Sequence, residues 1–530
     1  MKEHSRHVLF CGTHVLQTRY YGNQKVRAVV IRTGFNTAKG ELVRSIMFPK
    51  PVDFKFKQDS MKFIGVLALI ASIGMVYTLI LMVSRGDTVK LIFLRTLDLI
   101  TIVIPPALPA AMTVGIVFAQ ARMKKSRIYC INTSSINLCG ALNLFCFDKT
   151  GTLTEDGLDM HGVVESKEDS LEDLVTNMKE LKKGPFLTAM ATCHSLTILE
   201  NRLTGDNMLT ALSVARDCGM IEKKDSAVLV HVVPPSGSRN AYIEWTYGNE
   251  ANKTRMDTSE DPNSFVIELE NSDVIHLAIT GKCWQLIRQY FPDVIPKLAV
   301  RGTVFARMSP EQKAQLIEVL QKYGYYVGMC GDGANDCGAL KTAHAGISLS
   351  EAEASVASSF TSKEPNITCV PTTVREGRAA LVTSFGVFKY MACYSLTQFT
   401  SVCLLYWVGA NLTDFGFLWI DLVLLTSLSI TFGYTAAYHE LAARPPPVSL
   451  LSISPIVSII LQMIVNVIIQ VLVWRMTLLQ PWFEAFVHND EEDYMCHEVT
   501  IIFIVSNFQY IALAIVFSKS APYRKTIFSN

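Results

Sequence analysis

An aspartate at the end of an apolar run is the residue of this sequence best placed to do covalent chemistry. Leu142 to Phe147 are mostly apolar and predict a buried parallel strand that stops at Asp148. The Lys-Thr-Gly-Thr sequence that follows predicts a tight turn whose backbone N–H groups can bind a phosphate. A carboxylate at the carboxyl end of such a strand is placed to act as a nucleophile. This stretch therefore predicts covalent chemistry between Asp148 and a phosphoryl group.

Further stretches along the chain could hold the same phosphoryl group. Met308 to Lys313 places a lysine on the first turn of a helix, where its ammonium can neutralise phosphoryl oxygens. Taken alone, Lys313 is better explained as a solvated helix residue. Val327 to Leu340 predicts a strand followed by Gly-Asp-Gly-Ala-Asn-Asp, whose carboxylates are hard oxygen ligands for Mg²⁺. That motif is specific, whereas Thr-Gly-Asp at residues 204–206 is weak evidence by itself.

The order of these motifs resembles that of P-type ATPases, the ion and lipid pumps built on a haloacid-dehalogenase-like core. The resemblance implies that Asp148 attacks the γ-phosphorus of ATP in line. It also implies that Mg²⁺ is held by Asp148, the backbone carbonyl of Thr150 and Asp332. Lys313 and Thr204 would then bind the remaining phosphoryl oxygens. The other residues expected to contact the phosphate or to hold the loop are Lys149, Gly205, Asp206, Asn335 and Asp336.

Position 150 distinguishes a pump from a phosphatase. This chain has threonine there, where related phosphatases carry a second aspartate. Without that general acid–base, the aspartyl-phosphate should hydrolyse slowly by itself. A long-lived phosphoenzyme is typical of a pump, which couples its decay to a conformational change. A membrane-anchored phosphatase is therefore the weaker interpretation.

Six apolar segments predict a multi-pass α-helical membrane protein. Half of the 530 residues are hydrophobic, and the mean hydropathy is positive. The thirteen cysteines form no paired framework and are expected to be reduced thiols. The net charge of +1 is uninformative, and no nucleic-acid partner is expected. The basic links between the spans predict that both ends of the six-span segment lie in the cytosol. The link after the first span, which would then be luminal, opposes this topology because it carries Arg85, Lys90 and Arg95.

The fold class expected from these patterns is a membrane helix bundle with an inserted cytosolic α/β haloacid-dehalogenase-like (Rossmannoid) phosphorylation domain. Within that domain, residues 230–275 are expected to form a polar surface insertion. The expected parts are 1–57, a β-rich remnant of an actuator domain; 58–121, two spans (63–83 and 96–121), the second broken at Pro105–Pro109; 122–376, the phosphorylation domain; 377–518, four spans at about 385–408, 415–437, 450–474 and 499–517; and 519–530, a cytosolic tail.

The broken span indicates what the membrane part carries. A proline deep inside a span leaves backbone carbonyls without their usual hydrogen-bond donors. Such a break is tolerated where the chain lines a cavity, and in transporters it marks the binding site. The segment Pro105-Pro106-Ala107-Leu108-Pro109 resembles the signature of class-five P-type ATPases, specifically the polyamine-transporting subgroup of late endosomes and lysosomes. Calcium and sodium pumps place a carboxylate where Ala107 stands, and heavy-metal pumps use a Cys-Pro-Cys segment. The site is therefore expected to take something larger than a bare metal ion.

Two carboxylates in the fourth span are consistent with a polycation. Asp414 and Asp421 are expected to share one helix face, about 10 Å apart along its axis. Asp421 lies inside the hydrophobic segment, where an ionisable group is costly and usually functional. With Phe417 and Gln398 nearby, ion pairs, a cation–π contact and a hydrogen bond could hold an elongated polyamine. The alternatives are that Asp421 satisfies a neighbouring span and that Asp414 is a solvated loop acid.

Parts of the family pattern are missing. The chain lacks the Thr-Gly-Glu-Ser loop and the last two spans, and the nucleotide-binding domain is largely missing near 160–203. ATP affinity should therefore be poor, whereas Mg²⁺ and phosphate analogues could still bind at Asp148. The leading hypothesis is ATP- and Mg²⁺-dependent transport of polyamines across an endolysosomal membrane, this chain being a truncated or spliced form. The alternative is a catalytically silent membrane protein that binds partners or modulates the full-length pump.

Overall fold

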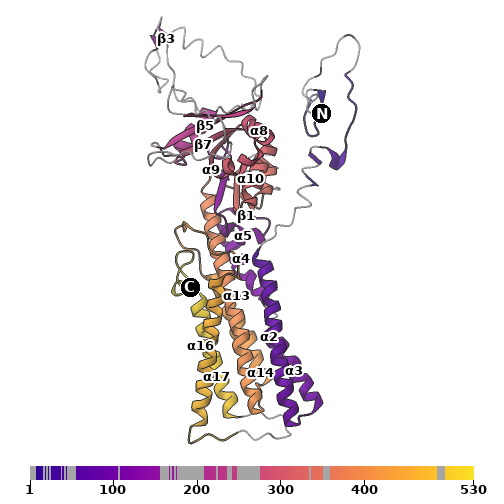
Figure 1. Ribbon diagram of the computed structural model, residues 1–530, viewed down its shortest axis with the longest axis vertical. Helices are drawn as coiled ribbons and strands as arrows, with labels where there is room; N and C mark the ends of the chain where they lie inside the picture. The colour runs from indigo at the N-terminus through magenta and orange to yellow at the C-terminus, as the bar shows by residue number, and fades with distance from the viewer. Residues whose placement is uncertain are drawn as a thin grey trace. The chain divides into compact units, whose positions relative to one another are not determined.

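The computed structural model divides the chain into two compact units (Figure 1). Unit 1 comprises Met1–Asn143, Glu351–Thr361 and Cys369–Asn530, and unit 2 comprises Leu144–Ser350 and Ser362–Thr368. The domain boundary expected at 122 therefore lies at Leu144 in this division. The structure describes residues 7–15, 18, 22, 26–37, 39–40, 43–44, 55–105, 108–154, 166–167, 170–171, 175, 208–222, 225–235, 241–247, 275–332, 336–349, 358–485 and 496–530.

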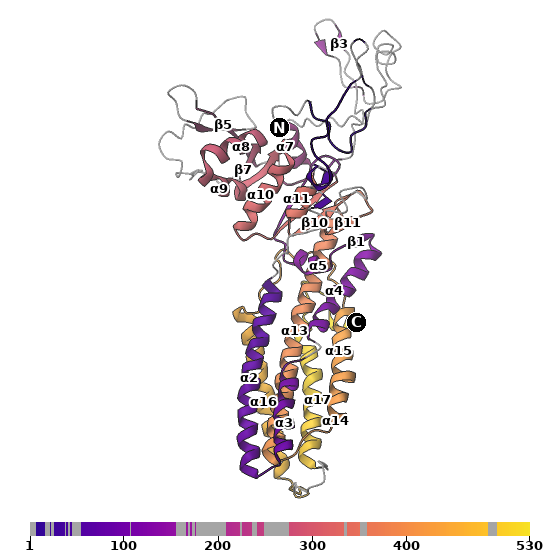
Figure 2. The same ribbon diagram turned by 90° about the vertical axis from the view of Figure 1, so that its right-hand side faces the viewer.

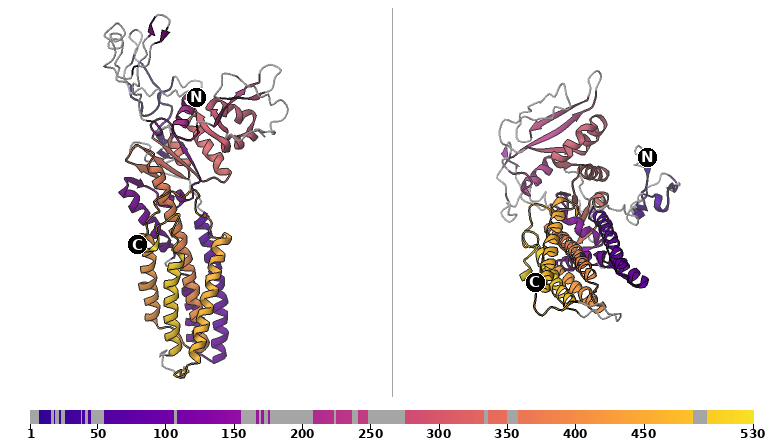
Figure 3. Two further views of the ribbon diagram at one scale, coloured as in Figure 1. Left: turned by 90° about the vertical axis from the view of Figure 1, so that its left-hand side faces the viewer. Right: turned by 60° about the horizontal axis from the view of Figure 1, so that its bottom comes forward.

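Unit 1 contains six helical segments that are long and apolar enough to cross a membrane (Figures 1 and 3). This confirms a multi-pass helical membrane protein with an α/β part. Their elements are α2 (Lys55–Arg85), α3 (Val89–Val103), α4 (Leu108–Lys125), α13 (Cys369–Val408), α14 (Asp414–Leu418), the π-helix η6 (Trp419–Leu425), α15 (Thr426–Tyr434), α16 (Ile453–Leu478) and α17 (His497–Phe517).

Helix α13 is the centre of the bundle. Of the residues in its most apolar 18-residue stretch, 94% are buried, whereas the corresponding share in the other five segments is 17–44%. It begins at Cys369, well before the expected span 385–408, and Pro371 is tolerated in its first turn, where the missing N–H costs nothing. Buried amides and hydroxyls join it to α16: Asn466 Nδ2 donates to Thr397 Oγ1 at 2.9 Å, and Gln470 Nε2 donates to Ser401 Oγ at 2.9 Å. Gln470 Nε2 also donates to Gln509 Oε1 of α17 at 2.8 Å. Such contacts hold helices together inside a membrane.

The segment expected to be the second span consists of two helices. Helix α3 ends at Val103 and α4 begins at Leu108, so the helix is interrupted around Pro105. The Leu108 N–H donates to the Pro105 carbonyl at 3.2 Å, which closes a turn across the break. Pro105 and Leu108 are buried and Pro109 is exposed. Pro106 and Ala107 lie outside the described residues.

Arg85, one of the three basic residues that opposed the expected topology of the first link, caps a helix. Its Nη1 donates to the Tyr406 carbonyl at 2.7 Å and its Nη2 donates to the Trp407 carbonyl. These are the last carbonyls of α13, which ends at Val408 before Gly409 at φ 92°. A cation at a helix C-terminus is stabilised by the helix dipole and satisfies carbonyls that lack intrahelical donors. Helix capping therefore explains the position of Arg85, and it does not account for Lys90 and Arg95.

We expect Arg85→Met to lower the free energy of unfolding by about 1 kcal/mol, because two carbonyls and the dipole at the end of α13 lose their cation. Titration of the reconstituted chain with SDS would measure it. Lys90→Met, which removes a basic residue from the same link, serves as the matched control. Equal midpoints for Arg85→Met and the parent chain would contradict the capping role.

Unit 2 contains a parallel sheet region and a second sheet. Strands β2 (Leu144–Phe147), β9 (Val327–Gly331) and β10 (Ala345–Ser348) are parallel, with β9 in the middle. Helices α10 (Pro310–Lys322) and α11 (Cys337–Thr342) bring further residues to this sheet. The second sheet has the order β6-β5-β7-β8, formed by Tyr242–Tyr247, Ser226–Val233, Ile275–Thr280 and Gly302–Ala306, with helices α7 (Met208–Asp217), α8 (Gly281–Tyr290) and α9 (Ile295–Arg301).

The expected surface insertion at 230–275 is wrong for part of that range. Strands β5 and β6 pair antiparallel, and β5 also pairs in parallel with β7, so both belong to the core sheet. Val228, Val230 and Val232 alternate with less buried residues and are each at most 8% exposed. The two prolines 234–235, taken from the sequence as a loop signal, only end the strand, since proline cannot continue a ladder.

The remaining described elements are short. Within the described residues of 1–54 the structure has the 3₁₀ helix η2 (Gly34–Asn36) and no strand, in contrast to the β-rich remnant expected there. In unit 1, β1 and β11 lie side by side and α5 packs on α13. The bounds are β1 (Ile128–Cys130), α5 (Ser134–Gly140), β3 (Ser166–Lys167), β4 (Ser170–Leu171), η4 (Pro292–Val294), β11 (Phe360–Ser362) and η7 (Ile527–Ser529).

Candidate phosphoryl-transfer site

Two aspartates follow neighbouring parallel strands at the same edge of the sheet. Phe147 of β2 is in register with Cys330 of β9, and the Asp148 N–H donates to the Cys330 carbonyl at 2.9 Å. Asp332 follows the end of β9 directly after Gly331. The carboxyl ends of parallel strands are the usual place for ligands in α/β sheets. The strand ends therefore bring the carboxylates of Asp148 and Asp332 together.

The turn after Asp148 is wound tightly around one carbonyl. The Lys149 carbonyl accepts hydrogen bonds from the N–H groups of Leu153 at 2.9 Å and Thr154 at 3.1 Å. Gly151 has a φ of 67°, a left-handed conformation that glycine adopts without strain. The side chain of Thr150 is exposed beside the aspartate. The side chain of Asp148 itself is 21% exposed and therefore partly accessible to solvent.

Helix α10 brings a lysine between two carboxylates. Lys313 Nζ donates to Asp148 Oδ1 and to Asp336 Oδ1, each at 2.7 Å. The start of α10 is held by a capping box in which the Gln312 N–H donates to Ser309 Oγ at 3.3 Å and the Ser309 N–H donates to Gln312 Oε1 at 2.9 Å. This cap fixes the first turn and therefore the direction of the lysine.

Asp336 is the most buried of the charged groups at the site. Its side chain is 0% exposed, and its Oδ2 has no hydrogen-bond partner among the described residues. A Cβ at Gly331 would lie 2.6 Å from that oxygen, so only glycine leaves room for it. Burial and the charge of Asp148 raise the pKa of Asp336 to about 6, in spite of Lys313. Burial would lower the pKa of Lys313, but the carboxylates of Asp148 and Asp336 raise it overall.

The three carboxylates fit a divalent cation with hard oxygen ligands. Asp148, Asp332 and Asp336 each offer a carboxylate oxygen, and these atoms lie within 4.8 Å of one another. Mg²⁺ prefers oxygen ligands and is commonly bound by a few carboxylates together with substrate phosphates. The unpartnered Oδ2 of buried Asp336 adds to this fit because a buried charge needs compensation. Sequence reasoning assigned Asp336 to holding the loop and missed its place among the candidate ligands.

The raised pKa of Asp336 predicts pH-dependent Mg²⁺ binding. Below about pH 6 this carboxyl is protonated, and a cation must displace the proton. We expect Mg²⁺ affinity, measured by calorimetry on the solubilised chain, to be about tenfold lower at pH 5 than at pH 7. Asp336→Asn should remove most of this dependence. Equal affinity of the parent chain at both pH values would contradict the prediction.

The raised pKa of Asp336 also makes the stability of the folded chain depend on pH. The neutral form of Asp336 is favoured in the folded chain, so its contribution to stability is full below pH 3.8 and is lost as the pH rises through about 6. Ionised Asp336 therefore lowers the stability of the folded chain near neutral pH. A bound cation would offset that cost.

Several predicted site residues lie outside the part of the chain that the structure describes. Lys149 and Thr150 are described and follow Asp148 directly, and Asp332 is a member of the carboxylate cluster. The predicted phosphate and loop residues that lie outside the described part are Thr204, Gly205, Asp206 and Asn335.

In the membrane unit, the predicted substrate residues are placed as follows. Asp421 Oδ1 accepts a hydrogen bond from the hydroxyl of Tyr394, which is buried on α13. Gln398, one turn further along α13, is 2% exposed. Asp414 is exposed at the start of α14, and Phe417 is half-buried. Sequence reasoning missed Tyr394; its position one turn before Gln398 was the available signal.

A π-helix changes the geometry expected for the two acids. Asp421 lies in η6, and the Thr426 hydroxyl donates to the Asp421 carbonyl at 2.9 Å. The expected spacing of about 10 Å on one face assumed a regular α-helix, and a π turn rotates the residues after it relative to those before it. Single π turns often occur at functional sites.

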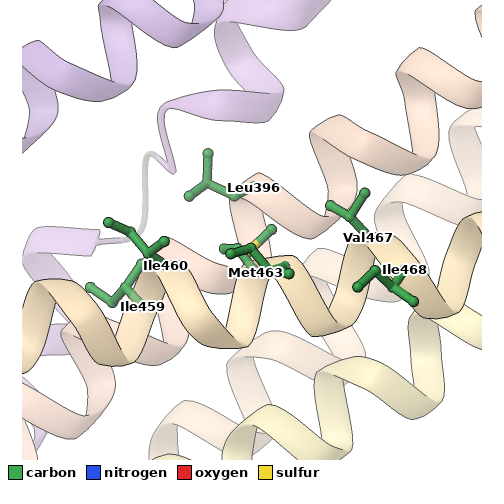
Figure 4. A pocket seen from close by; sticks show the side chains of 7 residues that line it. Leu396, Ile459, Ile460, Met463, Val467 and Ile468 are labelled. Atoms are coloured by element: carbon green, nitrogen blue, oxygen red, sulfur yellow. The ribbon is translucent and has the colours of Figure 1, made fainter.

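An apolar groove lies on α16, with one wall from α13 (Figure 4). It encloses about 360 Å³ and is lined by Leu396, Ile459, Ile460, Met463, Ile464, Val467 and Ile468. Since no charged or hydrogen-bonding side chain lines it, it does not offer a site for a polycation.

Known transporting ATPases are similar to nearly the whole chain. It is 36% identical to human "Polyamine-transporting ATPase 13A3" over 752 residues, covering 99% of this chain and 61% of that protein. It is 36% identical to "Probable cation-transporting ATPase catp-6" of Caenorhabditis elegans, covering 100% and 60%. It is 35% identical to human "Polyamine-transporting ATPase 13A2", covering 99% and 60%. No family model matches the chain.

The alignments are longer than the chain itself. An alignment over 752 residues with a chain of 530 leaves at least roughly 220 aligned positions without a residue of this chain. The chain spans about three fifths of the length of the curated relatives it matches.

Proposed function

We propose that this chain is a class-five P-type ATPase that takes a phosphoryl group from ATP onto Asp148 and uses it to move polyamines across a membrane. The observation that carries this proposal is the joint position of Asp148, Lys313 and Asp336 at the carboxyl edge of the parallel sheet. The printed names of the relatives, polyamine-transporting ATPases, support the substrate class.

The residues of unit 2 suit an in-line phosphoryl transfer. An oxygen of Asp148 forms a bond to the γ-phosphorus while the bond from that phosphorus to the bridging oxygen of ADP breaks, and ADP leaves with the electron pair. Lys313, released from the carboxylates, neutralises the equatorial oxygens. Asp148, Asp332 and Asp336 would hold Mg²⁺, which supplies charge neutralisation when bound. Thr150 offers no general base, so the aspartyl-phosphate is long-lived.

The residues of unit 1 suit a polyamine. Asp421 is a carboxylate on a membrane-spanning helix, and its hydrogen bond from Tyr394 fixes its direction. Gln398 adds a buried amide one turn away on α13. Ion pairs and amide contacts of this kind recognise ammonium groups. We place the protein in late endosomes or lysosomes, a location that co-imaging of a tagged chain with markers of these organelles would test.

Polyamine-stimulated turnover tests this proposal. In vesicles containing the chain, spermine should accelerate the decay of a ³²P-labelled phosphoenzyme. Asp421→Asn should remove the acceleration and leave the label itself intact. Label that decays at the same rate with and without spermine would refute polyamine transport.

The long alignment gap supports a second candidate function. The absent positions, expected from the sequence to be those of the nucleotide-binding domain, leave a membrane protein that binds partners or modulates a full-length pump without turnover. Under this alternative the chain takes no label from ATP at any concentration. It would still lower the transport rate of a co-expressed full-length relative, which uptake of labelled spermine would measure.

A further inference from the structure

Helices α4 and α15 meet at a glycine near the C-terminal end of α15. A Cβ at Gly433 would lie 2.2 Å from Phe118 Cδ2 and 2.7 Å from Val114 Cγ1, so no side chain fits there. Tyr434 adds a ring contact to Phe118 with centroids 4.5 Å apart. Small residues allow helix backbones to approach closely inside membranes. The two helices, seen together in Figure 2, are therefore in close contact at this point.

Arg122, one turn beyond Phe118 on α4, joins three helices through a single guanidinium. Its Nη1 donates to the Gly433 carbonyl of α15 at 3.3 Å. Its Nε donates to Glu376 Oε2 of α13 at 2.8 Å. The carboxylate of Glu376 is 9% exposed, and the Arg122 side chain is 23% exposed. A partly buried ion pair of this geometry is held more firmly than a surface pair, because water screens it less.

The neighbouring carbonyls of α15 are capped as well. Arg524 Nη2 donates to the Phe432 carbonyl at 2.5 Å, and Asn530 Nδ2 donates to the Thr431 carbonyl at 2.8 Å. Three successive carbonyls at the end of α15 thus accept side-chain donors from other segments. A cation at the C-terminal end of a helix also interacts favourably with the helix dipole. The end of α15 is therefore fixed from outside the helix, and among these three donors Arg122 is the one that comes from α4.

We infer that Arg122 is a positioning residue that ties the broken span to the helix bearing Asp421. Helix α4 starts directly after the break at Pro105, and α15 continues the π-helix that contains Asp421. A displacement of α4 therefore moves Asp421 through Arg122 and Gly433. The role of Asp421 in this inference rests on the proposed function; the tie itself does not.

The direct test is hydrogen–deuterium exchange of the chain in lipid nanodiscs. In Arg122→Met, the amides of the last turn of α15, residues 430–434, should exchange about tenfold faster than in the parent chain. Arg122→Lys should recover only part of the protection, because an ammonium lacks the planar fork that meets both partners. Lys124→Met, an exposed basic residue in the same turn, is the matched control. Unchanged exchange in Arg122→Met would overturn the inference.

A second measurement separates positioning from simple loosening. The dissociation constant for spermine should rise at least fivefold in Arg122→Met, while binding of Mg²⁺ with beryllofluoride at Asp148 stays at the parent value. Glu376→Gln should have a similar effect, and the double variant should be no worse than either single one, because both act through one contact. Additive effects would overturn the inference. Absence of spermine binding to the parent chain would refute the proposed substrate. The hydrogen–deuterium exchange of residues 430–434 would still show whether Arg122 connects α4 to α15.

Discussion

Lys313→Met is expected to weaken binding of Mg²⁺ with beryllofluoride, a phosphoryl analogue, by about a hundredfold. In the structure the ammonium of Lys313 lies 2.7 Å from carboxylates of both Asp148 and Asp336. Methionine keeps the length of the side chain but offers no charge, so the oxygens of a transferred phosphoryl group lose their neutralising partner. Calorimetry on the purified chain would measure the loss.

The same variant should also unfold more easily. Asp336 is fully buried, and removing the lysine leaves it beside Asp148 without a cation. Breaking a buried pair in this way costs about 3 kcal/mol. Lys322→Met, which changes an exposed lysine of the same helix, controls for general effects on α10. If Lys313→Met retains parental affinity and stability, the ion pairs at the site do not have the role assigned to them.

Asp148→Asn should abolish the phosphoenzyme while leaving the fold intact. An amide oxygen is a very weak nucleophile, so incorporation of ³²P from ATP should fall below detection, at least about a thousandfold. The pair between Lys313 and Asp336 remains in this variant, and the loss of the Asp148 charge removes one cause of the raised pKa of Asp336. The fold can be checked by the thermal unfolding midpoint, which should not fall. Persistent label in Asp148→Asn would exclude Asp148 as the acceptor.

Much of the site could be predicted because its signals are local. An apolar run ending in an acid indicates a strand with a residue at its carboxyl end, and the structure has β2 ending at Phe147 before Asp148. The Ser-Pro-Glu-Gln sequence indicates a helix start, and the capping box of Ser309 and Gln312 forms there. Both patterns depend only on residues that are close in the sequence, so they can be recognised without knowledge of the tertiary structure.

Features set by distant contacts could not be predicted in the same way. The burial of Asp336 depends on Gly331 and on Lys313 from another helix. Arg85 looked misplaced in a luminal link because its partners, the carbonyls at the end of α13, are more than 300 positions away. The π turn at Asp421 has no signal in a hydrophobic pattern that reads equally well as a regular helix.

The central claim is that Asp148 itself receives the phosphoryl group, and chemical trapping tests it most directly. Membranes containing the chain are incubated with Mg²⁺ and ATP, quenched in acid and treated with borohydride, which reduces an aspartyl-phosphate to homoserine. Peptide mass spectrometry then locates the reduced residue. We expect homoserine in place of Asp148 and at no other aspartate. Reduction at a different aspartate, or no reduction at any ATP concentration while ATP is consumed, would contradict it.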